Sequence, residues 1–238
     1  MRRKAWIWVS SILLLLGGMG LFIALDDRSG VQRFENLPWQ IDVRGPDRTQ
    51  VLGVVLGEST LSDLASGEWR LPIPEVRLFV EPDGTRSVEA YYSNARIPPF
   101  EANLVLLLGL DASGLERIWN ERTSERPTPS GARRYGVSDA ALRELSQVPI
   151  VEMSYAPRAR WEADLLRERF GDPSAQVRLD EDQTYWLYPD RALAIMVPTG
   201  RGRTLMHYVT MDRWNGLLER LEKAGSQRLG DTGEGDAS

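Results

Sequence analysis

The chain has 238 residues, a net charge of −5, one histidine and no cysteine. The lack of cysteine excludes disulfides, thiolate metal sites, cysteine nucleophiles and a cysteine-linked lipid, and one histidine cannot form a histidine-cluster metal site. Because the charge balance is acidic, we expect no nucleic-acid binding, and no motif indicates a cofactor.

The first predicted element is a transmembrane helix at Ala5–Leu25. Its residues are uncharged and mostly apolar, and the run is long enough to cross a hydrocarbon core of about 30 Å. Basic residues precede it and acidic residues follow it, so the positive-inside rule predicts a cytoplasmic N-terminus with the body across the membrane. A cleaved signal peptide is the alternative, but the run ends in Phe22-Ile23-Ala24-Leu25, which lacks the small-residue cleavage pattern. We therefore assign residues 1–27 to a cytoplasmic stub and an uncleaved anchor.

Residues 28–49 are polar and irregular, and we interpret them as a linker with one short strand, Trp39–Val43. A first α+β unit is predicted over residues 50–120. It begins with the apolar run Val51–Gly57. A short helix follows at Leu61–Ser66, and Thr60 with Asp63 fits the N-terminal capping pattern for it.

The rest of the first unit is predicted to hold strands and then a helix. Glu75–Val80 and Ser87–Tyr92 flank the turn Glu81–Gly84 and should form a hairpin. Asn103–Leu110 is apolar but too short to span a membrane, so a central strand is expected there. A helix follows, capped by Asp111 or Ser113, with an apolar face made of Leu115, Ile118 and Trp119.

Residues 121–149 are predicted to form an arginine-rich loop and a connecting helix. Thr123–Gly131 has no periodicity, so we interpret it as a loop, and Ser138–Gln147 has the pattern of a helix. Arg126, Arg133 and Arg134 lie in or beside the loop. These arginines belong either to a solvated surface loop or to a site for a carboxylate, a phosphate or an acidic partner surface.

A second α+β unit is predicted over residues 150–225. A strand at Val148–Tyr155 leads into a helix at Arg160–Arg169 with one apolar face. Turn residues then separate four strand-like runs, namely Ala175–Leu179, Thr184–Tyr188, Leu193–Val197 and Leu205–Thr210. Asp212 is expected to cap a last helix that ends at Gly225, and residues 226–238 have the composition of a disordered tail.

The two units repeat the same order of elements: helix, strand, turn, aromatic strand, apolar strand and helix. Val76-Arg77-Leu78 corresponds to Val177-Arg178-Leu179, and the offset of about 100 residues is far longer than a solenoid period. We therefore predict an α+β fold in which a transmembrane helix precedes two duplicated helix-plus-antiparallel-sheet units. Chance similarity between two α+β units is the alternative.

Two segments and one strand also carry a family resemblance. Gly57–Leu64 and Leu166–Pro173, together with the aromatic strand Tyr185–Tyr188, resemble parts of the BamE (SmpA/OmlA) family of outer-membrane assembly lipoproteins. That resemblance implies a fold like β-lactamase inhibitor protein and a role in the cell envelope. The lipid-bearing cysteine of those lipoproteins is absent here, so outer-membrane location is not implied. The chain is also similar to uncharacterised single-span envelope proteins of Gram-negative bacteria, which places the expected anchor in the inner membrane and the body in the periplasm.

No nucleophile elbow, phosphate-binding loop or dinucleotide fingerprint is present in the sequence. His207 is predicted to be a strand histidine with a local hydrogen bond, because no nucleophile or orienting partner is evident beside it. Two hypotheses follow. One is a non-catalytic periplasmic interaction or envelope-assembly module, with partner contacts at Arg126, Arg133, Arg134, Trp186 and Tyr188. The alternative is a hydrolase-like envelope enzyme whose site combines arginines with carboxylates. The identity of the protein partner and the oligomeric state are left open.

A pocket that joins arginines to carboxylates would favour the enzyme, whereas a broad exposed sheet or groove would favour the interaction module.

Overall fold

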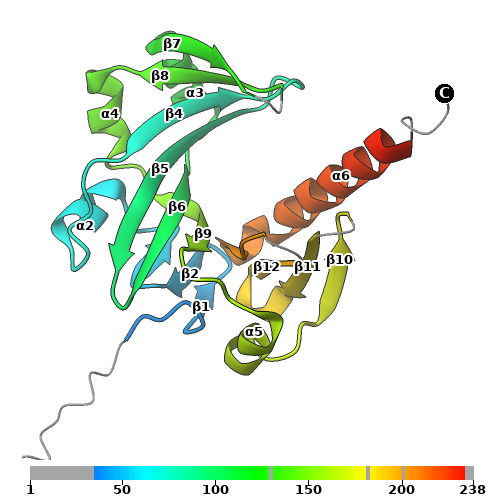
Figure 1. Cartoon of the computed structure of the whole chain (residues 1–238). Helices are drawn as coiled ribbons and strands as arrows, with labels where there is room; N and C mark the ends of the chain where they lie inside the picture. Colours follow the sequence, from blue (N-terminus) through cyan, green and yellow to red (C-terminus); the bar gives the residue numbers. More distant parts are fainter. Residues whose placement is uncertain (1–34, 129–130, 181–182, 200–201, 234–238) are drawn as a thin grey trace, which may run out of the picture. The chain divides into compact units, whose positions relative to one another are not determined.

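The computed structural model describes residues 35–128, 131–180, 183–199 and 202–233, with side chains as far as Ala224 (Figure 1). The chain divides at Glu35 into two units, and the second, from Asn36 onward, is the one described here. The predicted membrane helix Ala5–Leu25 lies outside the described residues. Within them, no helix is both long enough and apolar enough to cross a membrane.

The fold class is α+β with two antiparallel sheets, as the sequence predicts. The small sheet has the order β1-β2-β3, with β1 at Asp42–Gly45, β2 at Arg48–Val51 and β3 at Val54–Leu56. The large sheet has ten strands in the order β10-β11-β12-β13-β9-β6-β5-β4-β8-β7. Its strands are β4 Glu75–Val80, β5 Arg86–Ile97, β6 Phe100–Leu108, β7 Arg122–Pro127, β8 Arg133–Val137, β9 Ile150–Pro157, β10 Ala175–Arg178, β11 Gln183–Tyr188, β12 Leu193–Pro198 and β13 Leu205–Val209.

The helices begin where the sequence supplies capping side chains. Thr60 and Asp63 form the predicted capping box before α2, since each backbone N–H donates to the side chain of the other residue, at 2.8 and 3.2 Å. The Asp111 side chain accepts from the Gly114 N–H at 2.7 Å at the start of α3. The α-helices are α2 Leu61–Ser66, α3 Ala112–Asn120, α4 Asp139–Leu145, α5 Ala163–Phe170 and α6 Trp214–Gly233.

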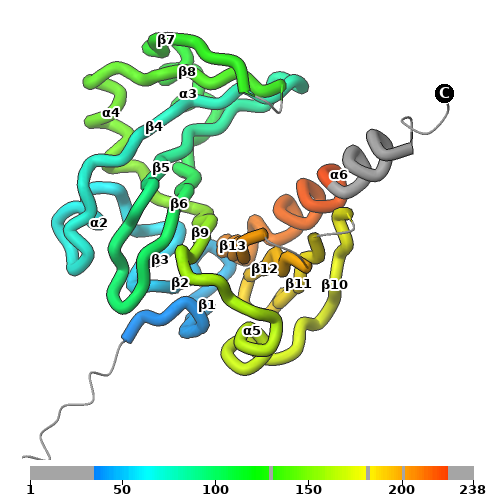
Figure 2. The backbone as a smooth tube through the Cα atoms, in the orientation of Figure 1, coloured from blue at the N-terminus to red at the C-terminus, as the bar shows by residue number. Residues whose placement is uncertain are grey.

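The large sheet has one face that carries the main core, which we call the core face. Along β6, Leu104, Leu106 and Leu108 are buried on it, as the two-residue period of a strand requires. Residues of α2, α3, α4, α5 and the small sheet belong to the same core cluster. The small sheet lies beside β9 and β13, and the Gly57 N–H donates to the Ile150 carbonyl at 2.7 Å (Figure 2).

On the opposite face, called the outer face, α6 packs over one part of the sheet and also reaches the β4–β5 turn, where Lys223 pairs with Asp83 at 3.2 Å. Trp214, Leu217 and Leu221 of α6 pack with buried residues of β11, β12 and β13 in a second, smaller core cluster. Figure 1 shows α6 beside β10–β12, while α2, α3 and α4 lie beside β4–β8. Part of the outer face over β4, β5 and β6 therefore does not belong to either core cluster.

The two halves of the chain contribute matching meanders to the large sheet. α2-β4-β5-β6 and α5-β10-β11-β12 have the same order, and the apolar strands predicted at Asn103–Leu110 and Leu193–Val197 correspond to the third strands, β6 and β12. β6 pairs with β9, β12 pairs with β13, and β9 and β13 pair with each other. The meanders thus share one sheet, and the duplication itself stays a prediction.

Three expectations about local structure are wrong. Thr123–Gly131 is not all loop, because Arg122–Pro127 is strand β7, paired with β8 at the edge of the sheet. The short strand expected at Trp39–Val43 instead lies at Asp42–Gly45, where β1 forms a hairpin with β2. The last helix does not end at Gly225, since α6 continues to Gly233 and includes part of the predicted tail. A glycine inside a helix costs only about 1 kcal/mol relative to alanine, so it does not have to end one.

Candidate functional site

Four apolar side chains lie on the outer face without a place in either core cluster. They are Phe79 of β4, Tyr91 of β5, and Val105 and Leu107 of β6, and we call them the outer strip. Tyr91 pairs directly with Val105, and its side chain is 40% exposed, while the other three are partly buried. An exposed apolar patch on a protein surface commonly marks a binding site.

Two arginines border the outer strip at one edge of the sheet. Arg126 of β7 is directly opposite Arg134 of β8, and Arg134 is directly opposite Phe79, so the three side chains form a row on one face. Neither arginine has an ion pair in the described part of the chain. Like charges directly opposite each other on a sheet are destabilising. This arginine pair is therefore a positively charged position where an anion would be stabilising.

The other arginines of this segment already have partners. Arg122 stacks on the Trp119 ring, with its guanidinium carbon 3.7 Å from the ring centroid. Arg133 is directly opposite Val80, which places it on the core-face side, and it forms an ion pair with Glu125 at 3.2 Å. The structure thus brings together Arg126 and Arg134 of the predicted site residues and separates Arg133 from them.

On its other side, toward β9, the outer strip is bordered by Glu152, which binds α6. Glu152 of β9 accepts from Arg220 at 2.6 Å and from Arg213 at 3.1 Å, and its side chain is only 15% exposed. Glu89 lies within the strip, on its middle strand β5, between Leu107 of β6 and Arg77 of β4. Arg77 forms an ion pair with Glu75 at 2.7 Å. Burial raises the pKa of Glu89, and the nearby charges of Glu81 and Glu152 add to this rise. Glu152 is thus occupied by α6, and Glu89 disfavours further negative charge near the middle of the strip.

His207 is held by two hydroxyl groups on the outer face beneath α6. Its Nδ1 is 2.8 Å from Ser154 Oγ on β9, and its Nε2 is 3.0 Å from Tyr185 OH on β11. Burial lowers the pKa of His207 to about 4, and the positive charge of Arg220 contributes to this. The predicted local hydrogen bonding of this strand histidine is confirmed.

This histidine is poorly suited to activate Ser154 as a nucleophile. A general base works best when its pKa is near the operating pH, whereas this imidazole disfavours a proton at neutral pH. In a serine–histidine–aspartate triad, a carboxylate on the second ring nitrogen stabilises the imidazolium, but Tyr185 occupies that position here. The arrangement therefore joins three strands across the sheet and does not build a triad.

Trp186 and Tyr188, which are predicted to be partner contacts, are buried in the structure. Their exposed fractions are 4% and 5%, and both belong to the main core. The Tyr188 hydroxyl donates to the Gly171 carbonyl at 2.9 Å, and Arg167 lies over the Trp186 ring. Successive side chains of β11 point to opposite faces of the sheet, and both faces are covered there. The aromatic residues of β11 are therefore not exposed on either face. Binding of a partner by these two residues stays a prediction, but their side chains present no exposed surface to a partner.

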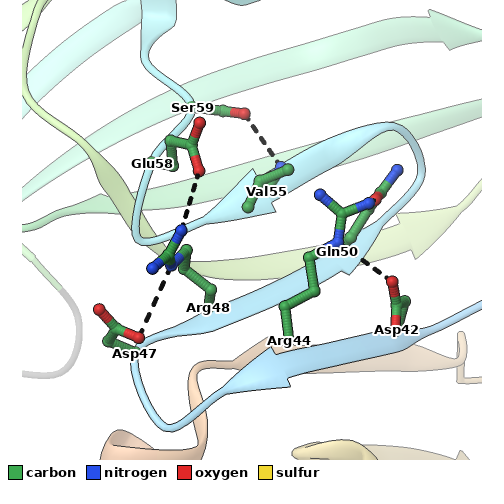
Figure 3. A network of polar contacts seen from close by, with 8 residues as sticks. All are labelled: Asp42, Arg44, Asp47, Arg48, Gln50, Val55, Glu58 and Ser59. Carbon is green, nitrogen blue, oxygen red and sulfur yellow. Dashed lines mark hydrogen bonds and ion pairs between the residues drawn. The ribbon is translucent and has the colours of Figure 1, made fainter.

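The small sheet carries a separate network of charged side chains (Figure 3). Arg44 contacts Asp42 at 3.0 Å and also bonds Gln50, while Arg48 lies 3.9 Å from Glu58. These side chains are largely exposed, and such pairs contribute little stability. Because the arginines are already paired with carboxylates or an amide, the network offers no free charge to a ligand.

The outer strip was missed in the sequence, although a signal for it was present. Asn103–Leu110 is apolar at almost every position, whereas a strand with one solvated face alternates apolar and polar residues. If β6 had a solvated outer face, the residues on that face would be polar, but Val105 and Leu107 stand there. Of the described residues, no three histidine, cysteine, aspartate or glutamate side chains group as metal ligands.

A scan against protein-family models finds no match for this chain, and searches of curated proteins and of solved structures find none either. The resemblance to the BamE family accordingly stays a prediction that rests on the sequence segments alone.

Proposed function

We propose that this protein is a membrane-anchored, non-catalytic interaction module of the bacterial envelope, with its body in the periplasm. The single observation that carries this proposal is the outer face of the large sheet, where Arg126 and Arg134, which have no ion pair among the described residues, border the outer strip. Aromatic and arginine residues supply most of the binding energy at protein interfaces. Trp186 and Tyr188 have no part in the proposed surface.

The anchor is part of the proposal and is supported by the sequence. Ala5–Leu25 has the length and apolar character of a membrane span, and basic residues precede it. Reporter fusions after Asp27 and after Ser238 should both be active outside the cytoplasm. Mature protein that begins near Asp26 would show a cleaved leader and contradict the anchor.

The binding role is tested by cross-linking in intact cells followed by affinity capture of the full chain. The double variant Arg126→Ala/Arg134→Ala should capture markedly less of its partner, because the charge-assisted contacts are lost. Its thermal unfolding should stay within a degree or two of the wild type, since neither arginine has an ion pair in the described residues.

The matched control is Arg178→Ala, which removes an exposed arginine from β10, the strand at the opposite edge of the same sheet. It should leave capture unchanged. If the double variant captures its partner as well as the control does, the arginine pair has no binding role.

A hydrolase-like enzyme is the second candidate, and the 2.8 Å contact between Ser154 and His207 is the observation that favours it. A fluorophosphonate probe, which labels activated serines, distinguishes the two candidates. We expect no labelling of Ser154, because a histidine with a lowered pKa is a weak base. Labelling that disappears in Ser154→Ala would make the enzyme the better proposal.

A further inference from the structure

We infer that the outer strip binds an acidic amphipathic helix of a partner protein, whose carboxylates pair with Arg126 and Arg134. This inference rests on the proposed function and names the partner's chemistry. Phe79, Tyr91, Val105 and Leu107 would contact the apolar stripe of that helix, and the arginine pair would contact its acidic end.

The position of the strip favours a helix over an extended segment. A peptide on the face of a sheet receives no backbone hydrogen bonds from the strands beneath it, and its own N–H and C=O groups must still be satisfied. A helix satisfies them internally. The same outer face already accepts α6 over β11, β12 and β13, so packing of a helix on this side is established within the fold.

Addition of a strand at the β7 edge is the other way for a segment to bind here, and the edge residues oppose it. Pro127 has no N–H to donate, and the pairing of β7 with β8 shifts register between Arg122 and Glu125. Prolines, irregular registers and charged side chains are the features that protect sheet edges from further pairing.

The charges at the strip select an acidic helix. Arg126 and Arg134 are adjacent like charges without an ion pair among the described residues. Across the strip, Glu152 is already bound by Arg213 and Arg220, so it does not offer a free carboxylate to basic residues. Arg126 and Arg134 therefore attract the carboxylates of a partner to their edge of the strip.

The size of the strip matches one helix. It covers β4, β5 and β6, and three strands are about 10 Å across, which is the diameter of a helix. Along the strands, the strip has three rows of paired residues, which contain Phe79, Leu107 and the Tyr91–Val105 pair. These rows extend over about 14 Å, which is the length of about nine residues in a helix. A helix of two to three turns then places anchors at positions i, i+3 or i+4, and i+7 on the strip.

The first experiment places the photo-cross-linking residue p-benzoylphenylalanine at Tyr91 in the full, membrane-anchored chain in intact cells. Tyr91 is suitable because it is aromatic and exposed. The control places the same residue at Gln176, which is exposed on β10 at the opposite edge. We expect an adduct from position 91, mapped by mass spectrometry to a partner segment with a helical apolar period and several acidic residues, and no such adduct from position 176.

The second experiment measures affinity for a synthetic peptide of the cross-linked segment, with the full chain in nanodiscs. Arg126→Ala/Arg134→Ala should weaken binding at least tenfold, and raised salt should weaken wild-type binding, whereas Arg178→Ala should change neither. Reversing the charges on both sides, with Arg126→Glu/Arg134→Glu and a peptide in which lysine replaces glutamate, should restore binding. Thermal unfolding of each variant verifies that it is folded.

Several results would overturn the inference. They are an adduct from position 91 with a lipid, with a second copy of this chain or with a basic segment, or no adduct at all. If a partner is captured but cross-links only through position 176, the proposed function survives and this inference fails. If no partner is captured by any route, both fail.

Discussion

Replacing the single histidine should remove most of the acid sensitivity of the fold between pH 7 and pH 5. His207 has a folded-state pKa of about 4, against an ordinary value of 6.5, so the unfolded chain binds a proton here that the folded chain rejects. The resulting stability is fully present above pH 6.5 and is lost as the pH falls toward 4. His207→Gln keeps a hydrogen-bonding side chain between Ser154 and Tyr185 and removes the titration.

The size of this effect follows from the pKa difference. The separation between 6.5 and about 4 corresponds to about 3 kcal/mol once the pH is below both values. Between pH 7 and pH 5 the part that is lost is about 2 kcal/mol. Glu89 has the opposite sign, since its raised pKa makes its contribution greatest in acid and smaller as the pH rises through that pKa.

The assay is urea unfolding of wild type and His207→Gln at a series of pH values from 5 to 7. When the two free energies of unfolding are subtracted, the contributions that both proteins share cancel, such as those of Glu89 and of the Glu152–Arg220 pair. We expect this difference to fall by about 2 kcal/mol, to the disadvantage of the wild type, on going from pH 7 to pH 5. A difference that does not change with pH would refute the assigned burial of the imidazole.

Three further predictions concern stability and are measured by denaturant unfolding. Gly57→Ala should cost about 3 kcal/mol or more, because the added Cβ would lie 2.0 Å from the Asp47 carbonyl oxygen at a positive φ of 89°. Gly84→Ala is its control, because φ is 85° and no atom lies within 4 Å of the added Cβ, so a cost of about 1 kcal/mol is expected. Equal costs for the two variants would contradict the close approach at Gly57. Trp186→Ala should cost about 3–5 kcal/mol, as for a buried aromatic, and a cost below about 1 kcal/mol would mean that the side chain is exposed after all. Thr60→Ala should cost about 1 kcal/mol through the lost cap of α2, and an unchanged midpoint would show that the cap is dispensable.

Elements specified by local chemistry could be predicted from the sequence. The capping residues Thr60 and Asp63 set the start of α2, and its bounds, Leu61–Ser66, are those predicted. The hairpin about Glu81–Gly84 was equally clear, because its turn residues are flanked by two strand-like runs. In both cases the information lies within a few neighbouring residues.

The candidate site could be predicted only in part, because it depends on which strands become neighbours. Arg126 and Arg134 were chosen from their charge and their segment, but only the pairing of β7 with β8 separates them from Arg133. β7 itself is polar on both sides because both sides are exposed, so it lacks the alternation that reveals a strand. Trp186 is hidden for the converse reason, since α5 and α6 pack on opposite faces of its sheet.

The pairing of β9 with β13 has a consequence for the order in which the chain acquires its structure during synthesis. β9 can pair with β6 as soon as Pro157 has emerged, because β6 precedes it in the chain. Its other edge stays unpaired until Leu205–Val209 has followed, after the whole second meander has been made. A chain stalled before β13 would expose the free edge of β9 together with unburied apolar residues such as Tyr155. Such a species is prone to aggregate, so we expect the incomplete chain to depend on a holding chaperone until its last strand arrives.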